Sequence, residues 1–299
     1  MVCYGTMRAY RPKAEAVALS GDRSLVFDKR KAHSGVAIEV PCGVCIGCQM
    51  SRRREWAIRC MHEMRMHSAS AFVTLTYDDK SIPPGGSLSL YDLQCFMKRL
   101  RKVRPAGLRF FACGEYGETF RRPHYHLLLL NSDFSDKRFY KSSASGSALY
   151  TSAELTGLWP LGRSDIGAVT AGSAAYVAGY VLKKSESRDY GDLAPEFRVM
   201  SRRPGLGSAW LDKFHPEAYK HDSAIMDGSE VGLPRFYDTK FELVDPVRNI
   251  FGDSKRLASL KRLRKVRARL NPDDLTQRRL RVREAVDLAK SKLFVREPT

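Results

Sequence analysis

Residues 121–131 read RRPHYHLLLLN, and this stretch constrains the fold more than any other part of the chain. The run of four leucines predicts a buried strand. Successive side chains of a strand point to opposite faces, so His124 and His126 share one face and Tyr125 points to the other. Two strand rises place the histidine Cα atoms about 6.6 Å apart. Imidazoles at this spacing can converge on one metal ion, so the stretch predicts part of a metal site.

A third ligand is expected from the preceding segment, CGEYGE, which ends shortly before His124. If the chain returns as an antiparallel strand, Glu115 lies beside the histidine pair. Two imidazoles and one carboxylate leave coordination positions open, and this set suits Mg²⁺ or Mn²⁺. Glu118 is the competing carboxylate, although we expect it in the turn.

The predicted elements follow the order strand, helix, strand, strand, then strand and helix. We expect strands at 36–40, 70–79, 108–117, 123–131 and 165–170, and helices at 49–68, 89–104, 152–158 and 173–185, the last with Ser173 as N-cap. Residues 132–147 and 201–210 are expected to be loops. This order predicts an α+β fold with a mainly antiparallel sheet and helices on one face. A basic tail is expected to be helical from 253 to about 295, with a break at Asn271-Pro272.

The excess of positive charge restricts the partners. Lysine and arginine number 51 against 33 acidic residues, a net charge of +18. Such an excess favours a polyanion, because neutralising phosphates releases counterions. The sequence shows neither a long apolar run nor a signal peptide, so we expect a cytoplasmic nucleic-acid-binding protein without a membrane segment.

Tyr176 and Tyr180 lie four residues apart in AAYVAGYVLKK. On a helix this spacing places both hydroxyls on one face, and Lys183 and Lys184 follow one turn later, where they can meet phosphate. A tyrosine pair at helical spacing is more often packing than chemistry. Beside a metal site, however, a tyrosine hydroxyl is a competent nucleophile for phosphoryl transfer.

Together these motifs resemble the HUH (His-hydrophobic-His) endonucleases. FVTLTY at 72–77 matches the first strand motif of their rolling-circle initiators. PCGVCIGCQMSRRREWAIRCMHE, CGEYG, SAAYVAGYVLKK and MSRRPGLG resemble, in the same order, the replication initiators of gokushovirus-group microviruses. The similarity extends over about residues 40–207, while residues 1–40 match weakly and the C-terminal third hardly at all.

The resemblance implies an RRM-like core with a metal-dependent nuclease site. A tyrosine nicks the viral origin strand, becomes linked to its 5′ phosphate and leaves a 3′-OH primer, and a second transfer closes the displaced strand into a circle. It assigns metal ligation to His124, His126 and Glu115, and the nucleophile roles to Tyr176 and Tyr180 with Lys183. Relatives often carry lysine where this chain has Gly179, which leaves the division of labour between the tyrosines open.

Cys42, Cys45 and Cys48 have the spacing C-x₂-C-x₂-C. Three thiols this close in a chain without a secretion signal predict a soft-metal site for Zn²⁺ or an Fe–S cluster. Cys3 is the expected fourth ligand, since family members often carry an early cysteine. Cys60 is the less favourable candidate, because it lies further along the following helix. The alternative is a group of ordinary reduced thiols.

Basic residues near these motifs are expected to contact phosphates and to add affinity rather than base specificity: Arg52, Arg53, Arg54, Lys184, Arg202 and Arg203. We predict three regions, an N-terminal segment at 1–69, a nuclease core at 70–207 and a basic helical extension at 208–299. The partners would be single-stranded and replicative-form viral DNA in the host bacterial cell. A host helicase is also expected, because the sequence has no G-x-x-x-x-G-K-[ST] motif.

Three other functions remain open at this stage. A related transposase or plasmid initiator would share the site. A non-catalytic nucleic-acid-binding protein would use the histidines only for structure. A metal-only phosphodiesterase would cut DNA without forming a covalent adduct.

Overall fold

The computed structural model describes residues 3–15, 24–117, 120–143, 146–179, 190–244, 253–269 and 272–293. The chain divides into two compact units. One contains Met1–Ser51 and Asn271–Phe294, and the other contains Arg52–Leu270 and Val295–Thr299. The three regions predicted from the sequence, 1–69, 70–207 and 208–299, stay a prediction.

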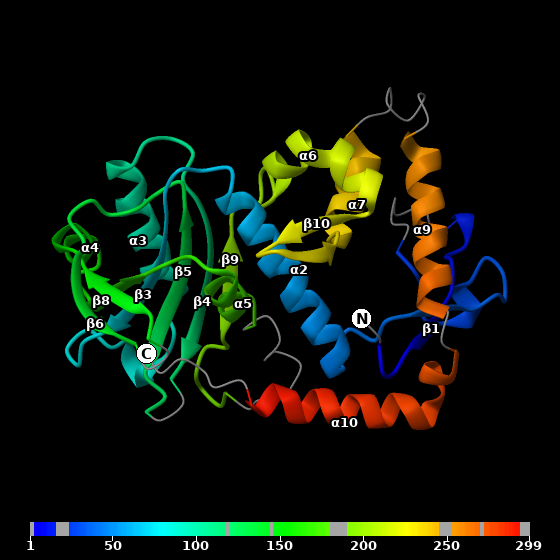
Figure 1. The fold of residues 1–299 in the computed structure, drawn as a ribbon. Coiled ribbons are helices and arrows are strands. Elements are labelled where there is room, and N and C mark those ends of the chain that lie inside the picture. The colour runs from blue at the N-terminus through cyan, green and yellow to red at the C-terminus, as the bar shows by residue number, and fades with distance from the viewer. Residues whose placement is uncertain are drawn as a thin grey trace. The chain divides into compact units, whose positions relative to one another are not determined.

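The larger unit is built on a seven-stranded antiparallel sheet with the order β6-β7-β8-β3-β5-β4-β9 (Figure 1). Its strands are β3 (Ser70–Tyr77), β4 (Arg109–Tyr116), β5 (Pro123–Leu130), β6 (Arg138–Ser142), β7 (Ala148–Thr151), β8 (Gly162–Gly167) and β9 (Phe197–Met200). Helices α2 (Ile46–Met64), α3 (Leu90–Val103), α4 (Ala153–Leu158) and α5 (Ala171–Gly179) accompany them. The predicted α+β class is therefore confirmed.

Strand β5 explains the leucine run, because every one of its residues is buried. Leu127 and Leu129 pack with α3 and α4 in one cluster, whereas Leu128 and Leu130 pack with α2 and α5 in another. Figure 1 shows α3 and α5 on opposite sides of the sheet. The expectation of helices on one face only was wrong, since a central strand with leucine at consecutive positions needs apolar cover on both faces.

Several local predictions also differ from the structure. The expected loop at 132–147 contains β6 and the β6–β7 turn, and β9 was not predicted. All five residues of β6 are exposed, so it lacks the alternation that reveals a strand with one buried face. The predicted loop at 201–210 ends early, because α6 (Ser208–His221) begins within it.

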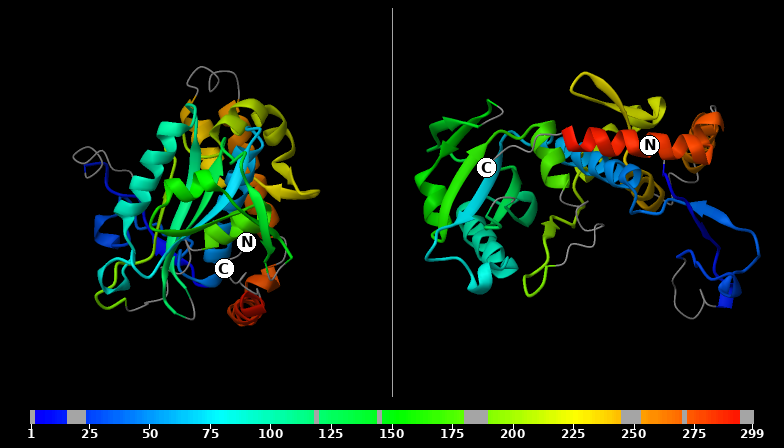
Figure 2. Two further views of the ribbon diagram at one scale, coloured as in Figure 1. Left: turned by 90° about the vertical axis from the view of Figure 1, so that its left-hand side faces the viewer. Right: turned by 90° about the horizontal axis from the view of Figure 1, so that it is seen from below.

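A second part of the larger unit packs around aromatic residues. It comprises α6, the hairpin of β10 (Ser223–Met226) and β11 (Ser229–Gly232), α7 (Arg235–Val244) and α9 (Asp253–Arg269). Figure 2 shows the yellow hairpin beside α6 in two further views. Trp210, Tyr237 and Leu257 are buried together there, and Arg264 of α9 forms ion pairs with Asp222 and Asp238.

The smaller unit contains β1 (Met7–Ala9) paired with β2 (Ile38–Val40), and α10 (Gln277–Leu293). Three short 3₁₀ turns complete the described elements: Lys29–Lys31, Pro84–Gly86 and Pro272–Leu275. The predicted helical tail with a break near Pro272 is confirmed by α9 and α10. Among the described residues, no helix has the length and apolar character needed to cross a membrane.

Candidate active site

The two histidines and the glutamate lie on neighbouring central strands. In the antiparallel pairing of β4 with β5, Glu115 stands directly opposite His124, and Cys113 stands opposite His126. The Nε2 atoms of His124 and His126 lie 2.8 and 2.9 Å from the same carboxylate oxygen, Oε1 of Glu115. All three side chains are buried. They form one polar cluster, which we call the His–Glu–His group.

The other ring nitrogen of each histidine has a protein partner that fixes the ring. Nδ1 of His124 lies 3.0 Å from the carbonyl oxygen of Arg122, which can only accept, so this nitrogen carries a proton. Nδ1 of His126 lies 3.0 Å from Oγ1 of Thr74, and the ring of Phe72 stacks on the imidazole. Both Nε2 atoms are therefore directed at the carboxylate, the orientation that metal-ligating histidines adopt.

The charge of the group suits a divalent cation. Burial raises the pKa of Glu115, but hydrogen bonds from His124 and His126 outweigh this effect and bring the pKa to about 2, so the carboxylate is ionised at neutral pH. One ligand atom from each of the three residues lies within 4.8 Å of the others. A divalent ion would replace the Nε2 protons that otherwise bridge to the carboxylate. The donor set thus fits a metal site with open positions.

Helix α5 places Tyr176 against the His–Glu–His group. The hydroxyl of Tyr176 donates to Oε1 of Glu115 at 3.2 Å and lies 3.5 Å from Nε2 of His126. Its ring meets the His126 imidazole edge to face, with the centroids 5.1 Å apart. The phenol oxygen is consequently in the immediate surroundings of any ion bound by the group.

The start of α5 is fixed by a reciprocal cap. The amide of Ser173 donates to Oγ1 of Thr170 at 3.1 Å, and the amide of Thr170 donates to Oγ of Ser173 at 2.8 Å. Thr170 rather than Ser173 is therefore the N-cap, and the helix begins earlier than expected because a capping box can use serine at its third position. Arg53 of α2 donates through Nε to the carbonyl of Ala175 at 2.7 Å and lies against Gly179.

Some predicted site residues lie outside the described residues. These are Tyr180, Lys183 and Lys184, which follow α5, and Glu118, the competing carboxylate. The nucleophile role of Tyr180 and the phosphate contacts of the two lysines accordingly stay predictions.

The MSRRPGLG motif forms a loop that buried charged residues hold in place. Glu63 accepts hydrogen bonds from the amide of Gly207 at 2.6 Å and from Nε of Arg109 at 3.0 Å. Arg59, whose side chain lies over the rings of two aromatic residues, donates to the carbonyl of Leu206 at 3.0 Å. Arg202 and Arg203 are exposed on this fixed loop, as is Arg54 on α2, while Arg52 is half-buried.

Sequence reasoning missed the residues that support the site from outside it. Thr74, Arg59 and Glu63 are examples. Thr74 belongs to the strand motif FVTLTY, so its position was noticed, but its partner on β5 depends on a strand register that the sequence does not specify.

The cysteine cluster forms in the smaller unit. Cys3 lies with Cys42, Cys45 and Cys48, and all four sulfur atoms are within 4.8 Å of one another. Cys60, the alternative fourth ligand, is instead buried in the apolar cluster between α2 and the sheet.

A sheet whose central strands carry a His–Glu–His group beside a helix-borne tyrosine is the arrangement expected of an HUH-type core. A family model for replication-associated proteins of the ORF2 type matches residues 70–185, which include this arrangement. The chain is 30% identical to the Replication-associated protein VP4 of Bdellovibrio phage phiMH2K over 278 residues, 88% of this chain and 86% of that protein.

Two further relatives carry similar names. The Replication-associated protein ORF2 of Spiroplasma virus 4 is 32% identical over 68% of this chain and 66% of its own length. The Replication-associated protein ORF4 of Chlamydia phage 1 is 26% identical over 66% of this chain and 52% of its own length. No solved structure matches the chain. The chain belongs to the family of phage replication-associated proteins, in agreement with a microvirus replication initiator.

Proposed function

We propose that this protein initiates rolling-circle replication by nicking the viral origin strand through a tyrosine and later rejoining the displaced strand into a circle. The observation that carries the proposal is the position of the Tyr176 hydroxyl, 3.2 Å from the carboxylate oxygen that both histidines contact. A buried His–Glu–His group has no need of a hydroxyl on its open side for packing, but phosphoryl transfer to tyrosine needs one there.

The nicking step exchanges one phosphate ester for another. The phenol oxygen of Tyr176 attacks the phosphorus of the scissile phosphodiester as its proton passes to solvent, and a P–O bond to tyrosine forms. The bond from phosphorus to the 3′ oxygen breaks, and that oxygen takes up a proton to become the 3′-OH primer. Because the 5′-phosphotyrosine is itself an ester, the reverse attack by a 3′-OH can rejoin the strand without ATP. Tyr180, one turn further along the sequence, would serve the second transfer.

The chain's own residues orient these atoms. His124, His126 and Glu115 would hold Mg²⁺ or Mn²⁺, which when bound supplies charge neutralisation at the scissile phosphate. The carbonyl of Arg122 and the hydroxyl of Thr74 hold the two imidazoles in place. The attacking oxygen is thereby fixed near the phosphate before the reaction, and this positioning lowers the barrier.

An exposed edge of the sheet offers a path for single-stranded DNA. Strand β6 carries the basic residues Arg138 and Lys141 around two aromatic side chains, Phe139 and Tyr140, which are 63% and 52% exposed. The guanidinium of Arg163 on β8 lies 5.0 Å from the centre of the Tyr140 ring. Aromatic rings stack on bases of any sequence and neighbouring cations meet phosphates. This combination favours single-stranded viral DNA as a substrate, in a host cell whose helicase would unwind the duplex.

A covalent-adduct assay tests the function. The full-length protein is mixed with Mn²⁺ and a single-stranded origin oligonucleotide labelled on the 3′ side of the nick, and labelled protein is detected on a denaturing gel. We expect an adduct with the wild type, a strong loss with Tyr176→Phe or Tyr180→Phe, and none with the double variant. His124→Ala, His126→Ala and chelation should also abolish the adduct.

Each other outcome has a definite meaning. Adduct formation by the double Phe variant would refute the tyrosine assignment. Cleavage without any labelled protein would indicate a metal-only phosphodiesterase. Tight binding without cleavage, at every divalent ion tested, would indicate a non-catalytic DNA-binding protein.

A further inference from the structure

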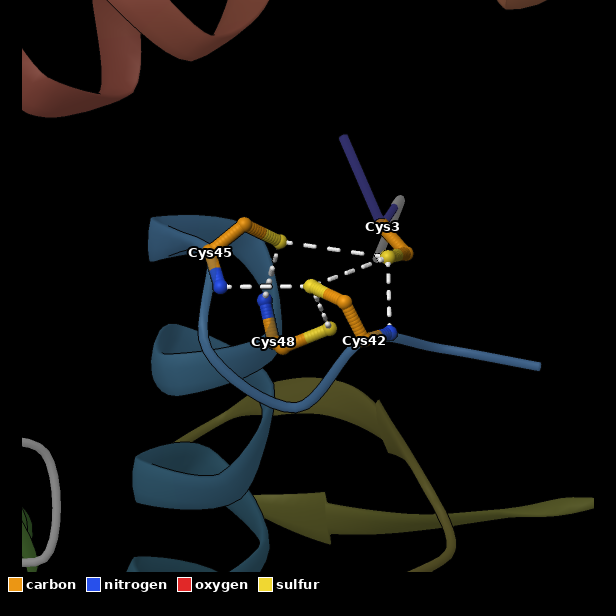
Figure 3. Close-up of side chains that lie close together, drawn as sticks. All are labelled: Cys3, Cys42, Cys45 and Cys48. Atoms are coloured by element: carbon orange, nitrogen blue, oxygen red, sulfur yellow. Dashed lines mark hydrogen bonds between the residues drawn. The ribbon is translucent and has the colours of Figure 1, made fainter. Parts of the chain in front are cut away.

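Four cysteines from two distant segments meet in the smaller unit (Figure 3). The antiparallel register of β1 with β2 pairs Met7 with Val40, so the residues just before β1 and just after β2 return to the same place. Cys3 arrives from the first segment. Cys42, Cys45 and Cys48 belong to the second, which turns into the first residues of α2. All four are half-buried, free cysteines.

The sulfur positions match the corners of one metal-centred tetrahedron. Sγ of Cys3 lies 3.6 Å from that of Cys42 and 3.9 Å from that of Cys45, and Sγ of Cys42 lies 4.0 Å from that of Cys48. A zinc–sulfur bond of about 2.3 Å gives a regular tetrahedron an edge of about 3.8 Å. Disulfide sulfurs would be only about 2.05 Å apart. A cubane iron–sulfur cluster binds each thiolate to a different iron, which spreads the sulfurs beyond these distances.

Backbone amides point at the sulfur atoms. The amide of Cys42 lies 3.2 Å from Sγ of Cys3, and that of Cys45 lies 3.3 Å from Sγ of Cys42. Sγ of Cys45 receives the amides of Tyr4 at 3.4 Å and Cys48 at 3.5 Å. Donors of this kind stabilise thiolate charge around a bound cation. Four thiolates so close together would repel strongly without one.

We propose that Cys3, Cys42, Cys45 and Cys48 bind a single structural zinc ion that holds the smaller unit together. All four coordination positions belong to the protein, so the site is closed to substrate and distinct from the His–Glu–His group in ligand chemistry. The ion closes the chain between Cys3 and Cys42, which are 39 residues apart. The inference stands independently of the proposed nicking function.

The site also explains how α10 is retained in this unit. Tyr4 follows Cys3 directly, and its amide donates to Sγ of Cys45. The hydroxyl of the same tyrosine donates to Asp287 of α10 at 2.5 Å. Fixing the backbone at Cys3 therefore fixes the residue that contacts α10, and loss of the ion should release both segments.

Metal analysis of the purified full-length chain tests the proposal. The variant H124A/H126A, which lacks the nuclease ligands, should retain one equivalent of zinc. In that background Cys45→Ser or Cys48→Ser should lower zinc at least ten-fold, whereas Cys95→Ser, a half-buried cysteine on α3, should leave it unchanged. Retention of zinc by the Cys45 and Cys48 variants, or one equivalent of iron with a coloured protein, would overturn the assignment.

Two measurements keep the test decisive if a cysteine variant folds poorly. Wild-type protein reconstituted with Co²⁺ should show the sulfur-to-cobalt absorption of a tetrahedral thiolate site, and its absence would contradict the proposal. Hydrogen exchange on the wild type should show protection of residues 3–10 and 277–293 falling at least ten-fold after zinc removal by chelation, with β3, β4 and β5 unchanged. Equal protection of α10 with and without zinc would refute the structural role. Neither result depends on adduct formation.

Discussion

Replacing Thr74 by valine should weaken divalent-metal binding at the His–Glu–His group while leaving the fold intact. Oγ1 of Thr74 lies 3.0 Å from Nδ1 of His126, and it is a buried side-chain partner of that nitrogen. Valine preserves the shape but has no acceptor, so the imidazole loses the bond that sets its orientation and tautomer. Loss of such a partner typically costs ten- to a hundred-fold in metal affinity, or about 1.4 to 2.7 kcal/mol.

The same strand supplies a matched control. Thr76 lies two residues further along β3, on the same face, and its register partner is His124. Among the described residues, His124 takes its Nδ1 partner from the Arg122 carbonyl instead, so Thr76→Val makes the same chemical change without removing a ligand's support. Thr74→Ser keeps the hydroxyl and should restore affinity.

Mn²⁺ titration by calorimetry, with thermal unfolding as a check on folding, measures the effect directly. We expect Thr74→Val to bind Mn²⁺ ten- to a hundred-fold more weakly than the wild type, Thr76→Val and Thr74→Ser. The reasoning is refuted if Thr74→Val binds as tightly as the wild type, or if Thr76→Val loses as much affinity.

Three further predictions concern stability and DNA binding. Burial lowers the pKa of His62 from 6.5 to about 3, so its neutral ring stabilises the fold fully above pH 6.5 and this contribution is lost as pH falls toward 3; urea midpoints should therefore drop with acid more steeply in the wild type than in His62→Phe. Leu128→Ala, at a fully buried position, should lower the free energy of unfolding by about 2–5 kcal/mol in urea denaturation, and a loss below about 1 kcal/mol would contradict the two-faced packing of β5. Tyr140→Ala should weaken binding of single-stranded DNA by about 1–3 kcal/mol in fluorescence anisotropy, whereas Tyr91→Ala, also exposed but on α3, should have no effect.

Much of the site could be predicted because its geometry is local. Alternation along one strand placed His124 and His126 on one face, and a short antiparallel return placed Glu115 beside them. The structure brings these three together at the predicted positions. Helical spacing likewise identified Tyr176, although its distance from Glu115 required the fold itself.

The remaining features depend on contacts between distant segments. The sequence of β5 does not say which helices cover its two faces, and exposed β6 has no apolar pattern from which a strand can be recognised. Thr74 acts through a register with β5, and Cys3 reaches Cys42 only through the pairing of β1 with β2. Strand registers are set by the sum of many packing contacts, which single motifs do not contain.

The separation of the site residues along the chain has a consequence for the order of assembly. Glu115 and His124 are nine residues apart in one hairpin, whereas Tyr176 is 61 residues from Glu115. Short loops close faster than long ones, and hairpins form within microseconds, so the ligand pair should exist before the distant helix docks. A folding chain would then acquire its affinity for the ion earlier than its nucleophile. Premature strand cleavage by a half-formed enzyme would be avoided by topology alone.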